Sequence, residues 1–212
     1  LTELTEGPPR DFFRPHFFVN TPDINPRFLQ TSGRAGFLIR AALAATLSGL
    51  WGMYAGFELC EARALPGKEE YLDSEKYQIR PRALSSYQPA ADNIIAEVAA
   101  LNRIRRANPA LHTHLGLRFY QAWNEQVLCY GKATPARDNV ILVLVSLDPH
   151  QPQEVRFEVP LWEFGLPDDG ALAVEELVGG GRFAWHGKFQ HWYFDPRAVP
   201  FAIFRVRPLE ET

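Results

Sequence analysis

The sequence predicts two regions of different fold class, an α/β region followed by an all-β antiparallel sandwich. In the first region, short apolar runs alternate with runs rich in alanine and leucine, which is typical of strands that alternate with helices. From about Leu115, short strand-like runs follow one another and are separated by turns rich in Gly, Pro, Asn and Asp. We therefore predict an α/β region at residues 1–114 and a β-sandwich at residues 115–212.

Four elements are expected in the α/β region. They are a strand at 16–19, a helix at 37–47, a strand at 50–57 and a helix from Asp92 to about Ala107. The strands are short, apolar and bounded by turn residues, as buried strands are. The first helix is rich in Ala and Leu after a glycine-marked loop at 31–36, and Ser48-Gly49 ends it. Asp92 is a candidate cap for the second helix, and Pro109 lies just beyond its end.

The sandwich is expected to contain several strands with short connections. The clearest candidates are 117–123, 127–132, 139–147, 154–159 and 201–206. A cluster of aromatic and basic residues at 185–193 could stack on a carbohydrate or a nucleic acid, but Gly187 favours a hairpin and an edge strand. Gly179–Gly181 lacks the Lys-Ser/Thr of a phosphate loop and opens no predicted helix, so we interpret it as a turn.

The composition is that of an ordinary water-soluble domain. The chain carries 22 Lys and Arg against 25 Asp and Glu, a net charge of -3, which gives no electrostatic reason to bind nucleic acid. The longest apolar stretch, residues 35–60, is interrupted by Arg40, Glu58 and glycines, so no membrane span is expected. With two cysteines and a polar start, neither a disulfide framework nor a secretory signal is expected, and a cytoplasmic location is predicted.

Two acidic residues lie where α/β enzymes place catalytic groups. Asp23 follows the first predicted strand in a polar turn that Pro22 stiffens, and Glu58 follows the second strand. Carboxylates at the carboxyl ends of parallel strands commonly form active sites. Capping of the adjacent turn explains each residue equally well on position alone. The triplet Glu75-Lys76-Tyr77 suits sugar or phosphate binding, although such triplets also occur on solvated loops.

Other common catalytic or metal-binding patterns are missing from the sequence. The pair His112 and His114 has no carboxylate or cysteine nearby at ligand spacing, so a packing or surface role is favoured over a metal site. There is no Gly-x-Ser-x-Gly motif, and Cys60 and Cys129 have no histidine partner in a recognisable motif, which makes them buried thiols. We expect no metal ion and no cofactor.

Four sequence blocks resemble the C-terminal portion of the maltose 1-phosphate-dependent α-1,4-glucan maltosyltransferases of glycoside hydrolase family 13. The blocks are FFVNTPD at 17–23, the run at 41–48, WGMYAGFE at 51–58 and EEYLDSEKY at 69–77. The resemblance implies an α-amylase-like (β/α)8 barrel followed by a β-sandwich. The strands at 16–19 and 50–57 would then be the seventh and eighth barrel strands. The helix at 37–47 would be the seventh helix, and the helix at 92–107 would close the barrel.

The same resemblance implies roles for individual residues. Asp23 matches the third carboxylate of the superfamily, which stabilises the transition state rather than attacking or protonating. Thr21 and Pro22 stand where the wider superfamily usually has Asn and His, which favours the maltosyltransferase branch. Lys76 and Tyr77 match a pair that contacts the maltosyl unit of the donor, and Glu58 matches a position to which we assign no role.

The implied activity is the transfer of maltosyl from maltose 1-phosphate to the non-reducing end of α-1,4-glucans, with retention of configuration and release of phosphate. The nucleophile, the acid/base and the phosphate site of the family lie upstream of these blocks. A complete barrel takes roughly 250 residues. We therefore expect the chain to be a C-terminal fragment, inactive alone, whose partners are the upstream part of the enzyme and a second copy in a homodimer. The alternatives are another α-amylase family hydrolase or transglycosylase acting on α-glucans, or an inert carbohydrate-binding or structural module.

Overall fold

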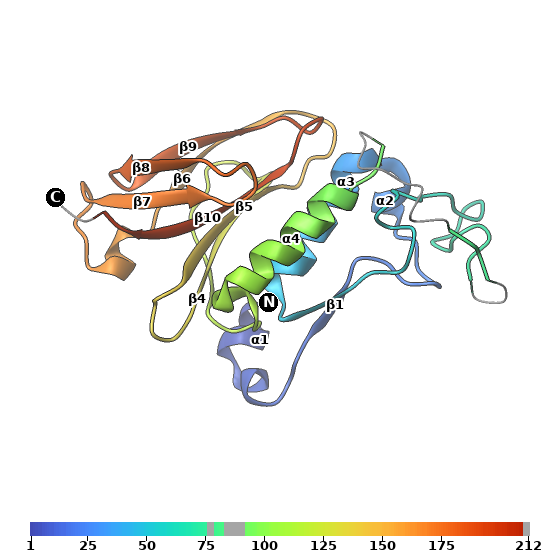
Figure 1. Ribbon diagram of the computed structural model, residues 1–212, viewed down its shortest axis with the longest axis horizontal. Coiled ribbons are helices and arrows are strands. Elements are labelled where there is room, and N and C mark those ends of the chain that lie inside the picture. Colours follow the sequence, from blue (N-terminus) through green and yellow to red (C-terminus); the bar gives the residue numbers. More distant parts are fainter. Residues whose placement is uncertain (76–78, 83–91, 210–212) are drawn as a thin grey trace.

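The computed structural model describes residues 1–75, 79–82 and 92–209, and these form an α/β part and a β-sandwich that share one long interface. In Figure 1 the sandwich lies on the left, α3 and α4 in the middle, and the loops that follow β1 and β2 on the right. The first part contains α1 (Thr2–Glu6), η1 (Pro8–Asp11), β1 (His16–Phe18), α2 (Arg27–Thr31), α3 (Gly33–Leu47), β2 (Leu50–Gly52), α4 (Ile95–Ala107) and η3 (Pro109–Leu111).

The strands β1 and β2 form a parallel pair joined by α3, which confirms the predicted order of strand, helix and strand. His16 pairs with Leu50, and Phe18 pairs with Gly52. The helix begins at Gly33, earlier than expected, because Gly36 is a packing glycine and not a loop marker. A Cβ atom there would lie 1.7 Å from Ser32 Oγ.

Two further predicted boundaries in the α/β part are wrong. The second strand ends at Gly52 rather than at residue 57, because residues 55–60 form turns in which Gly56 has a φ of +98°. Phe57 is still buried, since its ring packs 4.9 Å from that of Phe37. Helix α4 begins at Ile95 and is not capped by Asp92. Asn93 Oδ1 instead accepts a hydrogen bond from the backbone N–H of Ile95 at 3.3 Å.

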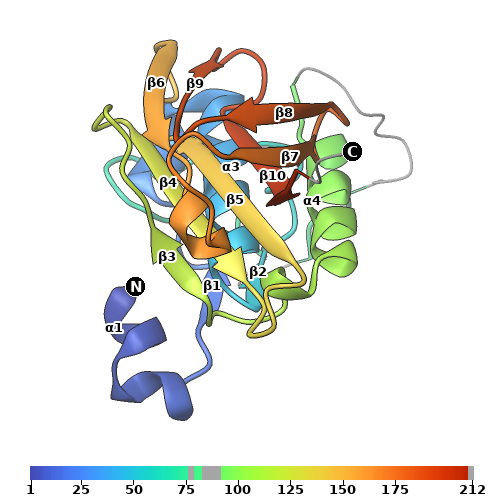
Figure 2. The same cartoon turned by 90° about the vertical axis from the view of Figure 1, so that its left-hand side faces the viewer.

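The second part is an antiparallel sandwich, as predicted. Its elements are β3 (Leu117–Phe119), β4 (Val127–Ala133), β5 (Val140–Ser146), β6 (Gln153–Glu158), η4 (Leu161–Phe164), β7 (Ala171–Glu176), β8 (Arg182–His186), β9 (Phe189–Phe194) and β10 (Phe201–Pro208). The large sheet has the order β3-β4-β5-β10-β7-β8, and the small sheet pairs β6 with β9. Figure 2 shows the small sheet at the end of the molecule away from α1.

The expected hairpin around Gly187 is wrong, although β8 is an edge strand as predicted. β8 pairs with β7, and β9 pairs with β6, so the chain passes from one sheet to the other at Gly187, which has a φ of +73°. The strand expected at 117–123 likewise ends at Phe119. Residues beyond it cross to the small sheet, where Ala122 bridges to Phe157.

The centre of the large sheet is buried on both faces. One face packs against the small sheet, through residues that include Leu142, Leu144 and Phe204. The other face packs against α3 and α4, and every residue of β5 is buried. On that second side, Tyr130 Oη lies 2.6 Å from Thr46 Oγ1 of α3. The α/β part is therefore fixed directly to the sandwich by a shared apolar core.

Arg105 in the last turn of α4 joins the helices at their C-terminal ends. Its guanidinium donates to the carbonyl oxygens of Ala45, of Ser48 at 2.9 Å and of Gly49 at 2.7 Å. These carbonyls lie at the end of α3, where backbone oxygens lack partners within the helix and attract a cation. Arg105 therefore caps α3 from the neighbouring helix.

Lys132 is a buried cation at the same interface. Its Nζ donates to the backbone oxygen of Thr113 at 2.6 Å, and among the described residues no carboxylate forms an ion pair with it. Burial, together with the nearby positive charge of Arg105, lowers the pKa of Lys132 to about 7. Near neutral pH the folded chain therefore holds a substantial fraction of this amine in its neutral form.

No helix in the described ranges is both long enough and apolar enough to cross a membrane.

The depressed pKa of Lys132 makes stability depend on pH. Between about 7 and the ordinary value of 10.5, the unfolded chain binds more protons at this group than the folded chain does. The free energy of unfolding should therefore rise with pH in this range, by up to about 1.4 kcal/mol per pH unit from this lysine. Lys132→Met should abolish that rise and raise stability near neutral pH. Urea denaturation at several pH values, with exposed Lys68→Met as the control, measures the effect. The same pH slope in both variants would contradict it.

Candidate functional site

A compact turn follows the carboxyl end of β1 and carries Asp23. The backbone N–H of Thr21 donates to the oxygen of Ile24 at 3.1 Å, and that of Ile24 donates back to the oxygen of Thr21 at 3.2 Å. Thr21 Oγ1 also accepts from the N–H of Ile24 at 3.0 Å. Asp23 is exposed between these two residues. The turn therefore holds a carboxylate at the edge of the parallel pair where the sequence predicted it.

Asn20 connects this turn to the loops that follow β2. It is buried, and its Oδ1 accepts a hydrogen bond from the backbone N–H of Tyr54 at 2.9 Å. Its Nδ2 donates to the hydroxyl of Tyr71 at 2.7 Å. Burial raises the pKa of Tyr71, so this hydroxyl stays neutral at physiological pH. One buried amide thus fixes three segments that are far apart in sequence.

Tyr54 extends the same connection to the segment that precedes Lys76. Its hydroxyl accepts a hydrogen bond from the backbone N–H of Glu75 at 2.9 Å. Its ring lies 5.6 Å from the ring of Tyr71 and 5.7 Å from the guanidinium carbon of Arg82. Tyr54 therefore links the turn after β1 with the loop that ends at Glu75.

Two arginines and two glutamates form a network of ion pairs within these loops. Arg82 contacts Glu61 through two hydrogen bonds, Nε to Oε1 at 3.0 Å and one terminal nitrogen to Oε2 at 2.9 Å. Its other terminal nitrogen donates to Glu75 at 3.0 Å, and Arg80 donates to Glu61 at 3.3 Å. The hydrogen bond with Glu61 holds the pKa of Arg82 above its ordinary value. Paired guanidinium and carboxylate groups of this geometry hold loops in a defined position.

Gly56 is required beside this network. A Cβ atom at this position would lie 2.4 Å from Glu61 Oε2, and the φ of +98° is one that other residues rarely adopt.

The backbone N–H of Arg80 and the Arg82 guanidinium lower the pKa of Glu75, so its carboxylate stays charged. Charge pairs therefore help to order the loops after β2, beside their backbone hydrogen bonds and the contacts of Asn20 and Tyr54.

The other predicted site residues have different outcomes. Glu58 Oε2 accepts from the backbone N–H of Gly56 at 3.0 Å within its own turn, which agrees with the capping interpretation. Lys76 and Tyr77 lie outside the described residues. Asn20, Tyr54 and Tyr71 are not among the site residues that the sequence predicts. A polar residue at the end of a buried strand is the signal that could have identified Asn20.

The two histidines and the two cysteines considered in the sequence make structural contacts and do not form a catalytic or metal-binding group. A ring nitrogen of His112 lies 2.7 Å from the oxygen of Arg105, and His114 is buried. Burial raises the pKa of both the Cys60 and the Cys129 thiol to about 12, so neither is a ready nucleophile. Within the described ranges, no three His, Cys, Asp or Glu side chains are grouped so that they could hold a metal ion.

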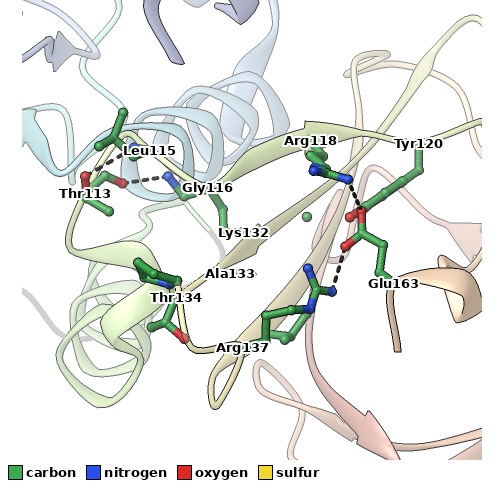
Figure 3. A pocket seen from close by; sticks show the side chains of 13 residues that line it. Thr113, Leu115, Gly116, Arg118, Tyr120, Lys132, Ala133, Thr134, Arg137 and Glu163 are labelled. Carbon is green, nitrogen blue, oxygen red and sulfur yellow. Dashed lines mark hydrogen bonds and ion pairs between the residues drawn. The ribbon is translucent and has the colours of Figure 1, made fainter. Parts of the chain in front are cut away.

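A separate cavity of about 310 Å³ lies in the sandwich beside β3 and β4 (Figure 3). Glu163 accepts hydrogen bonds there from Arg118 at 3.1 Å and from Arg137 at 2.7 Å. Lys132 lines the cavity, but its amine points away from these three side chains to Thr113. Because its charges are engaged with one another, this cavity offers a ligand little unpaired charge, and it contains none of the predicted site residues.

The link through Tyr54 predicts a local change on loss of its hydroxyl. Tyr54→Phe should leave the Glu75 N–H without its acceptor and speed amide hydrogen exchange at Glu75. Stability should fall by about 1 kcal/mol. Tyr193→Phe, at an exposed position in the sandwich, is the matched control. Unchanged exchange at Glu75 in Tyr54→Phe would show that this hydrogen bond does not hold the loop.

Residues 119–206 match the family model described as GLGE, C-terminal. The chain is 64% identical over 210 residues to the alpha-1,4-glucan:maltose-1-phosphate maltosyltransferase of Pseudomonas aeruginosa, covering 99% of this chain and 31% of that protein. It is 53% identical to the protein of the same name from Cereibacter sphaeroides, covering 97% of this chain and 30% of that protein. The chain thus spans about a third of the length of these relatives.

The fold is shared with α-amylase family structures. An AmyP variant in complex with maltotriose matches 93% of this chain and 42% of its own, with a TM-score of 0.66 at 16% identity. An α-amylase from Geobacillus thermoleovorans complexed with acarbose matches 94% of this chain and 40% of its own, with a TM-score of 0.60 at 13% identity. These structures show the fold alone. The family model and the two named relatives show that the chain belongs to the alpha-1,4-glucan:maltose-1-phosphate maltosyltransferase family and corresponds to its C-terminal part.

Proposed function

We propose that the enzyme containing this chain transfers maltosyl from maltose 1-phosphate to the non-reducing end of an α-1,4-glucan, releasing phosphate and retaining the α configuration. The observation that carries this proposal is the 64% identity to a named maltosyltransferase over 99% of the chain, which includes the turn that carries Asp23. The product would be a glycogen-like α-glucan. The chain supplies part of the active site, not all of it.

In this proposal Asp23 acts electrostatically. Retaining transfer needs a nucleophilic carboxylate and an acid/base carboxylate about 5 Å apart, with positive charge developing on the sugar ring in the transition state. We place that pair in the portion of the enzyme that this chain does not cover. Asp23 is exposed at the end of β1 and opposes the developing charge from a turn that is held by its own backbone hydrogen bonds. A preorganised charge of this kind costs no rearrangement during the reaction.

We propose that β1, α3 and β2 belong to the end of a (β/α)8 barrel. Parallel strands are normally covered on both faces and paired on both sides. Here a largely apolar hollow of about 440 Å³ lies beside β1, lined by residues that include Phe18, Leu43 and Leu47. Phe18 and Leu50 are about half exposed. The rest of the barrel would cover these side chains, with the closing helix α4 behind them and residues 115–212 as the separate sandwich domain.

Three further assignments complete the proposal. Lys76 and Tyr77 bind the maltosyl unit of the donor, close in sequence to Glu75, which Tyr54 and Arg82 hold. The enzyme is a homodimer, as the family resemblance implies. It acts in the cytoplasm, in keeping with Cys60 and Cys129 as free thiols.

Asp23→Asn in the full-length enzyme should lower turnover by roughly two to three orders of magnitude or more, because a preorganised charge is lost. Phosphate release from maltose 1-phosphate with a short maltooligosaccharide measures it. Glu58→Gln is the matched control, since Glu58 is bonded within its own turn, and it should retain most activity. Near-normal turnover in Asp23→Asn would remove this residue from the mechanism.

Lys76→Ala should mainly raise the KM for maltose 1-phosphate, because it removes a contact made in both the ground state and the transition state. The same phosphate assay with varied donor concentration separates KM from kcat. Lys68→Ala, at an exposed lysine of the same loop region, is the control. An unchanged KM together with an unchanged kcat would contradict the assignment.

A further inference from the structure

The outer face of the small sheet displays several aromatic side chains to solvent. Alternate residues of a strand point to opposite faces, and the inward set of β6 and β9 includes Val155, Phe157 and Phe194, which pack against the large sheet. The outward set includes Phe189, His191 and Tyr193 of β9 and Arg156 of β6, to which the crossing segment adds Trp123. We call these five residues the aromatic face.

Trp123 is held on this face by backbone pairing. Its N–H donates to the oxygen of Arg156 at 2.8 Å, and the oxygen of Gln121 accepts from Glu158 at 2.9 Å. Residues 121–123 therefore act as a third strand beside β6. This explains why the strand predicted at 117–123 is broken after β3, because its second half serves the other sheet.

Arg156 braces two of the rings. Its guanidinium carbon lies 4.9 Å from the centre of the Trp123 ring and 4.2 Å from that of Phe189. The two rings meet edge to face with their centres 5.5 Å apart. Trp123 is nevertheless 48% exposed, Phe189 42% and Tyr193 60%. Arg156 thus restrains the Trp123 and Phe189 rings while a large part of each faces solvent, and this restraint lowers the entropy cost of binding a ligand.

The charges on and around the aromatic face are balanced. Lys188 pairs with Asp168 at 2.6 Å and lies 3.8 Å from Glu158. Glu154 stands opposite Tyr193 in the register of the two strands. This balance favours a neutral ligand over an anionic or cationic one. Ring faces next to imidazole, phenol, guanidinium and carboxylate groups suit a sugar chain, whose C–H faces pack on aromatic rings and whose hydroxyls bond to polar groups.

The face is longer than one sugar unit. Phe189 and Tyr193 are four residues apart on β9, which is about 13 Å along an extended strand. His191 lies between them on the same face. A ligand that contacts the braced Trp123 and Phe189 rings at one end and Tyr193 at the other must contain several sugar units.

We propose that the aromatic face is a second binding site for an α-glucan chain, separate from the turn that carries Asp23. The choice of an α-glucan over other neutral sugar chains rests on the proposed function. The small sheet belongs to the sandwich, whereas the loops after β1 and β2 lie on the far side of α3 and α4 (Figure 1). A long acceptor tethered here raises the effective concentration of its chain ends at the transfer site.

Affinity electrophoresis of this chain in native gels that contain glycogen tests the proposal. Glycogen should retard the wild-type chain, and the double variant Trp123→Ala/Tyr193→Ala should bind at least tenfold more weakly, about 1.4 kcal/mol. Trp162→Ala is the matched control, because Trp162 is a half-exposed tryptophan of the sandwich outside the aromatic face. If the double variant fails to fold, Trp123→Phe is tested in its place. Because this variant keeps an aromatic ring, it should retain most of the retardation.

Three results would overturn the proposal: no retardation of the wild-type chain, equal retardation of the double variant when folded, or equal loss in Trp162→Ala. The phosphate assay with a short acceptor keeps the two proposals apart. In the full-length enzyme the double variant should keep its turnover with that acceptor and lose efficiency with glycogen. Retardation without any phosphate release would refute the proposed function alone. Phosphate release without retardation would refute the second glucan site alone.

Discussion

The large sheet, whose central strand β5 is buried on both faces, is the constraint on which the rest of the molecule depends. A parallel pair as short as β1 and β2 cannot bury its own surface, and α3 covers it on one side only. Because α3 and α4 pack in turn on β5 and β10, the sandwich serves as a rigid support for the α/β part. The cap that Arg105 places on α3 and the buried amine of Lys132 lie at this contact. The position of the turn that carries Asp23 is thus set from the sandwich outward.

A few polar side chains connect the candidate site to the buried strands and hold its loops in place. Asn20 ends the buried strand and bonds to both Tyr54 and Tyr71, and Tyr54 passes the constraint to Glu75. The loops after β2 contain little regular structure, so their geometry depends on these hydrogen bonds and on the Glu61 and Arg82 pair. Such polar networks position groups well when every member is satisfied. This is how a chain with two short parallel strands can present a carboxylate in a defined place.

Patterning was enough to predict the strand, helix, strand order, the antiparallel sandwich and the location of Asp23, because each depends on local periodicity and on turn residues. Where the prediction failed, a distant contact decided the structure. Gly36 looked like a loop marker because the Ser32 side chain that excludes a Cβ there is invisible in the pattern. The change of sheet at Gly187 and the crossing of residues 121–123 depend on which strands pair, which no local signal encodes. The role of Asn20 likewise arises from contacts with Tyr54 across 34 positions and with Tyr71 across 51 positions.

The central claim is that this chain supplies the Asp23 part of a maltosyltransferase active site whose remaining part lies in the portion of its relatives that it does not cover. The direct measurement is phosphate release from maltose 1-phosphate with a short maltooligosaccharide. It compares the chain alone with a chimera in which this chain replaces the matching portion of the Pseudomonas aeruginosa protein. We predict release by the chimera and none by the chain alone. A folded chimera that hydrolyses plain α-glucan without releasing phosphate from maltose 1-phosphate would contradict the account.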